Sequence, residues 1–331
     1  MKILILEPGA WGTALGILLS KRNEVSFWYG DKKLASKIDR FRENERLPGI
    51  KIPQKIFISP ELEKGIKGLD LIIIASPSFN FRKILLKLER FEKLPPLLGI
   101  AKGIEKETLK LPSQIVEEIF DKISYAHLSG PGFAKEIVGG KSAKEVIASK
   151  NRTFLKKLKE IFSIRPLKIY TTTDLIGVQL AGAIKNALAI GISLVEANIQ
   201  NPEIEKIQPK LIELGLKEML KIGKAMGAKK ETFLGPAGLE DLILTSTNPL
   251  SRNFQFGKNL YFNTEKMRQE IKERKITVEG FDNALSLYKL GKIHKLNLPM
   301  ISEIYKVIYK RTSPEKTIKN LIKLTEACER G

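Results

Sequence analysis

A lysine interrupts an apolar helical run near the middle of the chain. The run GVQLAGAIKNALAIG covers residues 177–191, and Lys185 followed by Asn186 breaks its apolar centre. Ala181 and Gly182 share the helical face of the lysine and leave space beside its ammonium group. Burial of an ammonium group is costly and lowers its pKa, so a lysine in apolar surroundings is usually partnered or functional. We predict that Lys185 exchanges a proton with a hydroxyl or carbonyl group; the alternative is a side chain that reaches the surface.

A second polar cluster follows in the segment GPAGLEDLILTSTNPLSRNFQFG, residues 235–257. It brings together an acid, two hydroxyl groups, an arginine and an amide: Asp241, Thr245, Ser251, Arg252 and Asn253. These types can hold a phosphate and orient a lysine, because the guanidinium fork matches phosphate oxygens. Helix caps or loop residues are the alternative interpretation for the two hydroxyl side chains.

A glycine-rich turn follows the first apolar run. Gly9 and Gly12 fill the last two places of a G-x-G-x-x-G fingerprint, and Glu7 stands in the first. Small residues at this turn let backbone amides and the next helix N-terminus approach a pyrophosphate. An ordinary glycine-rich turn between a strand and a helix is the alternative. A carboxylate near a diphosphate is repulsive unless it points away or is protonated, so Glu7 opposes the standard interpretation.

The second strand-like run ends in EVSFWYGD. In NAD enzymes an acid at this point binds the adenosine ribose, whereas NADP enzymes carry an arginine. Asp31 is the candidate acid, with Lys32 and Lys33 directly after it. A helix N-cap is an equally good interpretation of Asp31. The choice between NAD and NADP stays open.

Two further signals come from strand ends. Lys102, in AKG, closes the fourth strand-like run and is expected to point toward a ligand. The motif SGPGFAKE, residues 129–136, opens a helix with glycines and offers backbone amides to a polar ligand. A plain strand end and a plain helix cap are the alternatives.

The elements that position these residues alternate through the first half of the chain. Short apolar runs predict strands, and amphipathic stretches between them predict helices. Apolar strands without polar alternation indicate a buried parallel sheet. We predict an α/β fold, with a Rossmann-like, doubly wound, mostly parallel sheet over residues 1–173 and an all-α domain over residues 174–331. The expected strands are 2–6, 24–29, 69–76, 96–101, 124–130, 143–149 and 166–171; the expected helices are 11–22, 31–44, 80–91, 111–123 and a long one over 174–198, which Asp174 would cap.

Composition describes an ordinary globular protein. The 331 residues are 43% hydrophobic and 28% charged, with a net charge of +20. Lysines alternate with glutamates rather than forming a basic block, so we expect a solvated surface that attracts phosphates and no nucleic-acid partner. The apolar stretch after Lys2 is too short for a signal peptide or an integral membrane segment. With Cys328 as the single cysteine, the chain is expected to be cytoplasmic.

Taken in order, the motifs resemble the NAD(P)-dependent glycerol-3-phosphate dehydrogenase family over nearly the whole chain. They are GAWGTALG, AKGIEKET, SGPGFAKE, DLIGVQLAGAIKNALAIG, GPAGLEDLILT, SRNFQFG and VEGF. The resemblance implies reversible oxidation of sn-glycerol 3-phosphate to dihydroxyacetone phosphate with NAD or NADP, supplying glycerol 3-phosphate for phospholipid synthesis.

The same resemblance implies roles for individual residues. Lys185 would be the general acid/base at the C2 oxygen, and Arg252 with Asn253 would bind the phosphate. The implied substrate-binding residues are Lys102, Gly130, Gly132, Lys185, Asn186, Asp241, Thr245, Ser251, Arg252 and Asn253. The implied cofactor-binding residues are Gly9, Ala10, Trp11, Gly12, Lys102, Ala134, Arg252, Thr277 and Glu279. No metal site is expected, and a homodimer is compatible with the family.

Several positions depart from the family pattern. Glu7 replaces the first glycine of the fingerprint, and Gly30 stands where an Arg or His for the NADP 2′-phosphate is usual. Gly132 replaces a Ser or Thr, and the loop over residues 198–215 lacks the usual Gly-x-Asn and Thr-Arg-Gly elements. Two other hypotheses therefore remain: a diverged paralogue acting on another phosphorylated or 2-hydroxy compound, and a non-catalytic nucleotide- or phosphate-binding protein.

Overall fold

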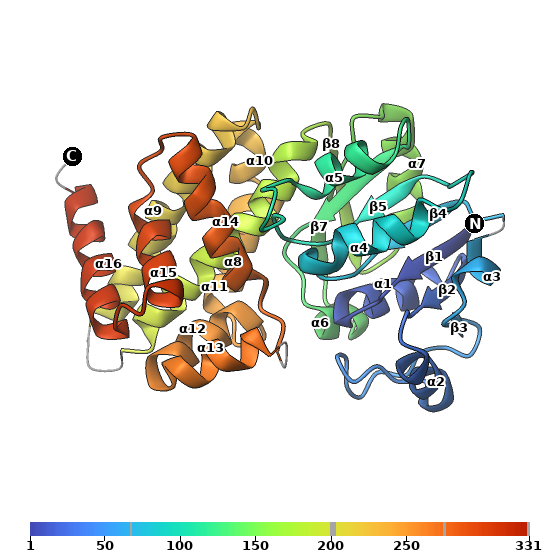
Figure 1. Ribbon diagram of the computed structural model, residues 1–331, viewed down its shortest axis with the longest axis horizontal. Helices are drawn as coiled ribbons and strands as arrows, with labels where there is room; N and C mark the ends of the chain where they lie inside the picture. Colours follow the sequence, from blue (N-terminus) through green and yellow to red (C-terminus); the bar gives the residue numbers. More distant parts are fainter. Residues whose placement is uncertain (67, 199–202, 274–275, 330–331) are drawn as a thin grey trace. The chain divides into compact units, whose positions relative to one another are not determined.

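The chain folds into two compact units. The computed structural model describes residues 1–66, 68–198, 203–273 and 276–329 (Figure 1). One unit comprises Met1–Ala101 and Pro112–Leu175, and the other comprises Lys102–Leu111 and Ile176–Gly331. Residues 199–202 of the divergent loop and the side chain of Cys328 lie outside the described residues.

The first unit is built on one eight-stranded sheet. Its strands follow the order β3-β2-β1-β4-β5-β6-β7-β8, and every neighbouring pair is parallel except β6 with β7. The strands are β1 Lys2–Leu6, β2 Glu24–Trp28, β3 Phe57–Ser59, β4 Leu71–Ile74, β5 Leu97–Gly99, β6 Tyr125–Ser129, β7 Ala143–Ala148 and β8 Leu167–Thr172. The chain moves outward from β1 in one direction through β2 and β3, and in the other through β4 to β6. Ligands of such sheets bind at the carboxyl ends of the strands beside this reversal.

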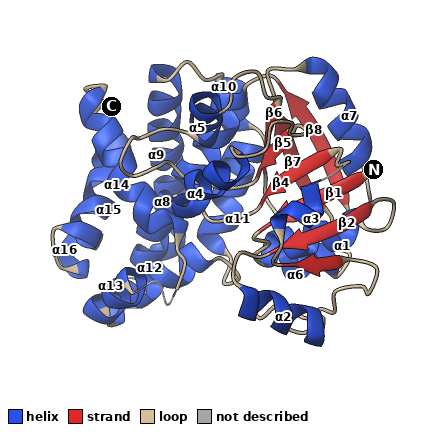
Figure 2. Ribbon diagram, turned by 45° about the vertical axis from the view of Figure 1, so that its right-hand side comes forward, coloured by secondary structure: helices blue, strands red, loops and turns tan. Residues whose placement is uncertain are grey.

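Helices flank this sheet (Figure 2). They are α1 Ala10–Leu19, α2 Lys32–Phe41, α3 Leu62–Ile66, α4 Ser78–Leu88, α5 Pro112–Ile119, α6 Ala134–Val138 and α7 Arg152–Phe162. Apolar residues of β1 and β4 are at most 2% exposed, which explains why those strands are apolar on both faces. A Cβ on Gly16 of α1 would lie 2.3 Å from the Phe27 ring, so glycine lets this helix approach β2 closely.

The predicted mostly parallel, doubly wound sheet is confirmed. All seven expected strands are present, and β3 is an eighth that the sequence analysis missed. Its three residues begin with Phe57, which is 58% exposed, so this edge strand lacks an apolar run long enough to be recognised.

The described residues of the second unit form helices and no strand. The elements are α8 Leu175–Glu196, α9 Ile204–Ala225, α10 Lys230–Leu234, a π-helical segment Pro236–Glu240, α11 Asp241–Thr247, α12 Arg252–Phe262, α13 Thr264–Lys272, α14 Glu279–Ile293, α15 Pro299–Tyr309 and α16 Pro314–Glu329. The predicted all-α character and the long helix α8 are confirmed. Helix α8 is apolar and long enough to cross a membrane, but 94% of its apolar window is buried, as in the core helix of a bundle.

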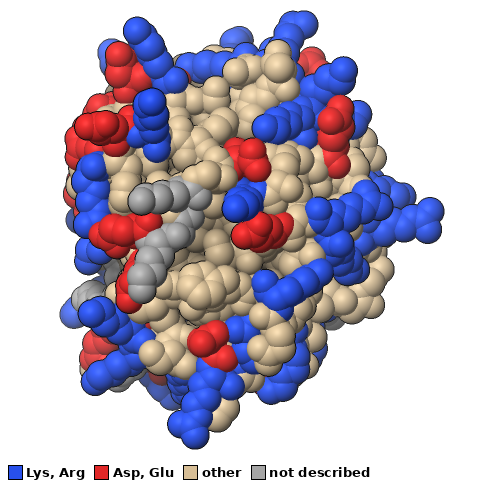
Figure 3. Space-filling model, turned by 90° about the vertical axis from the view of Figure 1, so that its right-hand side faces the viewer, with Lys and Arg blue, Asp and Glu red and all other residues tan. Residues whose placement is uncertain are grey.

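Charged side chains of both signs project from the face shown in Figure 3, between broad uncharged areas. Figure 3 shows one face on which Lys and Arg outnumber Asp and Glu while acidic side chains lie among them. Where the two signs are interspersed, the pattern is typical of a solvated face.

Candidate active site

Lys185 lies in the buried middle of α8 and has two polar partners. Its ammonium Nζ donates to Thr245 Oγ1 at 2.6 Å and lies 3.1 Å from Asp241 Oδ1. The side chains of Lys185 and Asp241 are only 7% and 2% exposed. Helix α11 supplies both partners from positions 241 and 245, which are one turn apart and therefore share a helical face. The lysine is thus a buried, paired charge rather than one that reaches the surface.

A second lysine completes this cluster. Lys102 Nζ lies 2.7 Å from Asp241 Oδ2, so each carboxylate oxygen faces one ammonium group. Thr245 Oγ1 also lies 3.2 Å from Asp241 Oδ1. Burial alone would raise the pKa of Asp241, but the ammonium groups of Lys102 and Lys185 outweigh burial and hold that pKa below its usual value. The carboxylate therefore stays ionised and supplies the countercharge for both lysines.

A relay of amides fixes the backbone around the lysines. Asn186 Nδ2 donates to the Lys102 carbonyl at 3.2 Å, and Asn253 Nδ2 donates to Asn186 Oδ1 at 2.9 Å. The relay ends where the Gly280 amide donates to Asn253 Oδ1 at 3.0 Å. A Cβ on Gly280 would lie 2.3 Å from the Asn186 carbonyl oxygen, so only glycine permits this approach. The relay joins α8, α12 and α14 behind the lysine cluster.

Asn283 is a positioning residue that the sequence analysis missed. Its Nδ2 donates to the carbonyls of Lys102 and Ala183 at 2.9 and 3.0 Å, and its Oδ1 accepts from the Ile104 amide at 3.1 Å. Asn283 is fully buried in α14. A buried asparagine on an apolar helix face was the available signal, because such an amide needs hydrogen-bond partners. These bonds tie the segment Lys102–Leu111 to the helical unit.

The N-terminus of α12 carries the predicted phosphate ligands. Ser251 is the N-cap, and its Oγ accepts from the Phe254 amide at 3.2 Å. Arg252, the first residue of the helix, is exposed, whereas Asn253 is 8% exposed and belongs to the relay. A helix N-terminus and an exposed guanidinium group together favour a phosphate.

The turn after β1 leaves the N-terminus of α1 without a side-chain cap. Gly9 is the N-cap residue, and no side chain accepts a hydrogen bond from the first turn, in contrast to α2, α7 and α12. A Cβ on Gly12 would lie 2.6 Å from Ala75 Cβ, so the helix starts close to the end of β4. Uncapped amides of this kind suit the pyrophosphate of a dinucleotide.

A buried network holds this turn in place. The Pro8 carbonyl accepts from Asn44 Nδ2 at 2.9 Å and from the Tyr29 hydroxyl at 3.2 Å. Asn44 Nδ2 also donates to Thr13 Oγ1 at 2.8 Å. Burial raises the pKa of Tyr29, which keeps its hydroxyl protonated as a donor. The turn is therefore fixed by side chains that lie beneath it.

Glu7 is directed toward the end of β2. Its Oε1 accepts from the Gly30 amide at 2.8 Å, and its own amide donates to the Trp28 carbonyl at 2.8 Å. Its φ of 51° lies in the left-handed region, where a glycine is usual. Asp31, the other candidate acid, caps α2 by accepting from the Lys33 and Leu34 amides at 2.8 and 3.2 Å. The N-cap interpretation of Asp31 is thus the one observed.

The glycine motif before α6 lies beside the α1 turn. Trp11 Nε1 donates to the Gly132 carbonyl at 3.2 Å, and α6 begins at Ala134. A Cβ on Gly130 would lie 2.3 Å from the Lys144 carbonyl oxygen, so a side chain there is excluded by backbone. The predicted cofactor residues of the first unit therefore belong to two adjoining turns.

Two predicted cofactor residues lie in the helical unit. Glu279 is the first residue of α14, and Thr277 lies two residues before it; both are half-buried. The structure thus places the predicted residues in two groups. Gly9, Ala10, Trp11, Gly12, Gly130, Gly132 and Ala134 belong to the first unit, and Lys102, Lys185, Asn186, Asp241, Thr245, Ser251, Arg252, Asn253, Thr277 and Glu279 belong to the second.

Comparisons with known proteins decide the family. A model described as NAD-dependent glycerol-3-phosphate dehydrogenase N-terminus matches residues 2–155, and one described as the C-terminus matches residues 174–319. The chain belongs to this family.

Relatives match this chain over nearly its full length. It is 36% identical over 327 residues to glycerol-3-phosphate dehydrogenase [NAD(P)+] of Janthinobacterium sp. (strain Marseille), with 97% of each chain covered. It is 32% identical over 324 residues to the protein of that name from Thermoanaerobacter sp. (strain X514), again with 97% of each covered. The crystal structure of glycerol-3-phosphate dehydrogenase from Coxiella burnetii is similar with a TM-score of 0.90 and 27% identity, covering 97% of this chain and 98% of that one.

Packing explains one departure from the family pattern. Gly132 occupies the position where a Ser or Thr is usual, and a Cβ there would lie 2.8 Å from Ile137 Cδ1 and 2.9 Å from Glu145 Oε1. Glu145 is fully buried in β7. Its carboxylate therefore fills the space that a larger side chain at position 132 would need.

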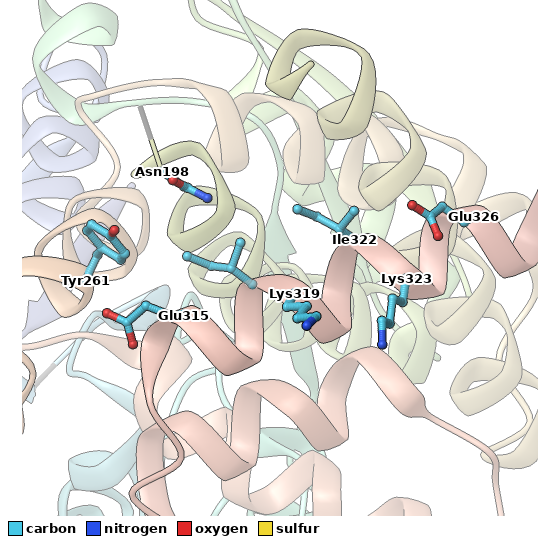
Figure 4. Close-up of a pocket in the computed structure, with 8 residues that line it drawn as sticks. Asn198, Tyr261, Glu315, Lys319, Ile322, Lys323 and Glu326 are labelled. Carbon is cyan, nitrogen blue, oxygen red and sulfur yellow. The ribbon is translucent and has the colours of Figure 1, made fainter. Parts of the chain in front are cut away.

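A surface pocket in the helical unit lies apart from these residues. Figure 4 shows its lining, formed mainly by α16 together with Asn198 and Tyr261. None of the residues that line it belongs to the lysine cluster or to the amide relay.

Proposed function

We propose that this family member is an NAD(P)-dependent glycerol-3-phosphate dehydrogenase, which interconverts sn-glycerol 3-phosphate and dihydroxyacetone phosphate. The observation that carries the proposal is the buried cluster in which Asp241 holds Lys102 and Lys185 at 2.7 and 3.1 Å. A buried lysine and a part-buried lysine on one buried carboxylate are costly as a purely structural device, whereas a proton donor beside a second cation suits a carbonyl substrate.

In the reductive direction, the protonated Lys185 donates to the C2 oxygen of dihydroxyacetone phosphate as the alcohol forms. In the oxidative direction, its neutral amine accepts the proton of the C2 hydroxyl. Thr245, which accepts from Lys185 Nζ at 2.6 Å, and Asp241 orient the amine. Lys102 adds positive charge, and the amide relay holds its backbone in place.

Other residues bind the ends of substrate and cofactor. Arg252 and the N-terminus of α12 would bind the substrate phosphate. NAD(P), which supplies or accepts the hydride at C2, would be held through its pyrophosphate by the uncapped turn from Gly9 to Gly12. The absence of a side-chain cap at α1 and the close approach at Gly12 both fit this group.

The proposal extends to the cellular role. The two domains, residues 1–173 for the dinucleotide and 174–331 for the substrate, would work in the cytoplasm to supply glycerol 3-phosphate for phospholipid synthesis. A single cysteine in 331 residues supports a reducing compartment. A homodimer is part of the proposal through the family.

The test compares the native chain with Lys185→Met. Oxidation of NADH and of NADPH is followed with dihydroxyacetone phosphate, and Lys157→Met, at an exposed position of α7, serves as the matched control. We expect turnover with at least one cofactor in the native chain and the control, and a kcat lower by at least about 100-fold in Lys185→Met. A folded native chain without turnover would contradict the proposal and is the result expected of a diverged paralogue or a non-catalytic binding protein. Full activity in Lys185→Met would contradict the role of the lysine.

A further inference from the structure

We propose that the Glu7 carboxylate binds the adenosine ribose hydroxyls and makes this chain prefer NAD(H) over NADP(H). The inference rests on the proposed function, because it assumes that the turn after β1 holds a dinucleotide. It assigns to Glu7, at the end of β1, the task that an acid at the end of β2 performs in other doubly wound folds.

The position of the carboxylate supports this assignment. Residues β1 Leu6 and β2 Trp28 are register partners, so Glu7 follows directly at the carboxyl edge of the sheet. From there its Oε1 reaches the Gly30 amide at 2.8 Å, which is beyond the last residue of β2. Oε2 has no donor among the described residues. The carboxylate thus stands at the end of β2 with one oxygen available to a ribose hydroxyl.

The alternative acid is engaged elsewhere. Asp31 Oδ1 accepts two backbone amides as the N-cap of α2. An oxygen that caps a helix is held in the geometry of that cap. Glu7 is therefore the better placed of the two carboxylates.

Two departures from the family pattern form one structural pair. A Cβ on Gly30 would lie 3.1 Å from Glu7 Oε1 and 3.1 Å from Trp28 Cη2. Such contacts are too close unless a neighbour moves, and Trp28 is held by its Nε1 bond to the Pro60 carbonyl at 2.9 Å. An Arg or His at position 30 would therefore compete with Glu7 for the same space. The chain therefore has the Glu7 carboxylate at this place and not the Arg or His usual at position 30.

Charge then sets the preference. A 2′-phosphate beside the half-buried Glu7 carboxylate would meet like charge, whereas a 2′-hydroxyl would donate to it. The cations near this edge are exposed, so solvent screens their attraction for a phosphate: Lys32 and Lys33 on the first turn of α2, and Arg46, whose Nη1 would lie 3.8 Å from a Cβ on Gly9. The expected balance favours NAD(H).

The test measures dissociation constants of NADH and NADPH by calorimetry at one fixed ionic strength. The native chain should bind NADH at least about tenfold more tightly than NADPH. Glu7→Gln keeps an acceptor for the Gly30 amide but removes the charge, so NADPH should bind about tenfold more tightly and NADH several-fold more weakly. Asp31→Asn is the matched control, because asparagine also caps helices, and it should leave the ratio unchanged.

Glu7→Gly provides a second variant in which the left-handed backbone is unstrained, and it should shift the ratio in the same direction. Equal binding of both cofactors by the native chain, or an unchanged ratio in both Glu7 variants, would overturn the assignment. A ratio that collapses in Asp31→Asn instead would transfer the role to Asp31. If neither cofactor binds the native chain, both the proposed function and this inference fail. If both cofactors bind equally well, only this inference fails.

Discussion

Asp241 pairs with two lysines, so its removal should destabilise the chain more than removal of Lys185. In Asp241→Asn, the ammonium groups of Lys102 and Lys185 remain in the cluster without their countercharge. Both lie within 3.1 Å of the carboxylate, and the side chain of Lys185 is only 7% exposed. Removing one partner of a buried ion pair lowers the free energy of unfolding by about 3–5 kcal/mol.

Lys185→Met leaves the other ion pair of the cluster in place. Asp241 keeps Lys102 at 2.7 Å, and methionine fills much of the volume of the lysine stem. The variant loses the hydrogen bond to Thr245 and one ion contact, for which about 1–2 kcal/mol is expected. The two variants should therefore differ by about 2 kcal/mol or more, although both should lose turnover.

Urea unfolding followed by circular dichroism measures this difference, and hydrogen exchange in peptides from α8 and α11 locates it. The pKa of Asp241 is lowered in the folded chain, so its stabilising contribution is present above the unfolded value of 3.8 and is lost as the pH falls through the folded pKa. The deficit of Asp241→Asn should accordingly be constant above about pH 5. A Lys185→Met variant that is as unstable as Asp241→Asn would refute the shared-countercharge argument.

Two other predictions concern buried groups of the helical unit. Burial raises the pKa of Glu218 from 4.5 to about 7, so the folded chain holds a proton that the unfolded chain has lost, and the free energy of unfolding should fall by about 3 kcal/mol as the pH rises through that window. Glu218→Gln should flatten this pH profile, measured by urea unfolding. An equally steep profile in the variant would assign the effect to another group. Gly280→Ala places a Cβ 2.3 Å from the Asn186 carbonyl oxygen and should lower the free energy of unfolding by about 1–3 kcal/mol, with a lower kcat. Gly235→Ala is the control, because its Cβ would lie 3.4 Å from its nearest neighbour and should change the melting temperature little. Equal effects of the two substitutions would contradict the packing argument.

Sequence patterns predicted the elements better than the contacts between them. Apolar runs identified seven strands and α8, because burial on both faces of the sheet and all round the helix leaves long stretches without polar residues. The lysine with its acid and hydroxyl partners was also predicted, from residue types that are costly to bury alone. Asn283 was missed because it acts on Lys102 across 181 residues of sequence, and no local pattern reports such a bond. The direction of Glu7 was open for the same reason: its partner, the Gly30 amide, is 23 residues away and follows the end of β2.

The departures from the family fingerprint become intelligible when they are taken in pairs. Glu7 fills the space beside Gly30, and the buried Glu145 fills the space beside Gly132. In each pair a carboxylate oxygen stands next to a glycine, 3.1 Å from a Cβ on Gly30 and 2.9 Å from a Cβ on Gly132. A reversion at Gly132 would therefore press on the buried Ile137 and Glu145 side chains, at a cost of about 1–3 kcal/mol from overpacking. A reversion at the exposed Gly30 would displace the Glu7 side chain. Restoring only the residue at the glycine position would measure this contact rather than the function of the usual residue. The informative variant therefore replaces the acid and keeps the glycine. It removes the charge and makes room, and it adds no atom at the glycine position.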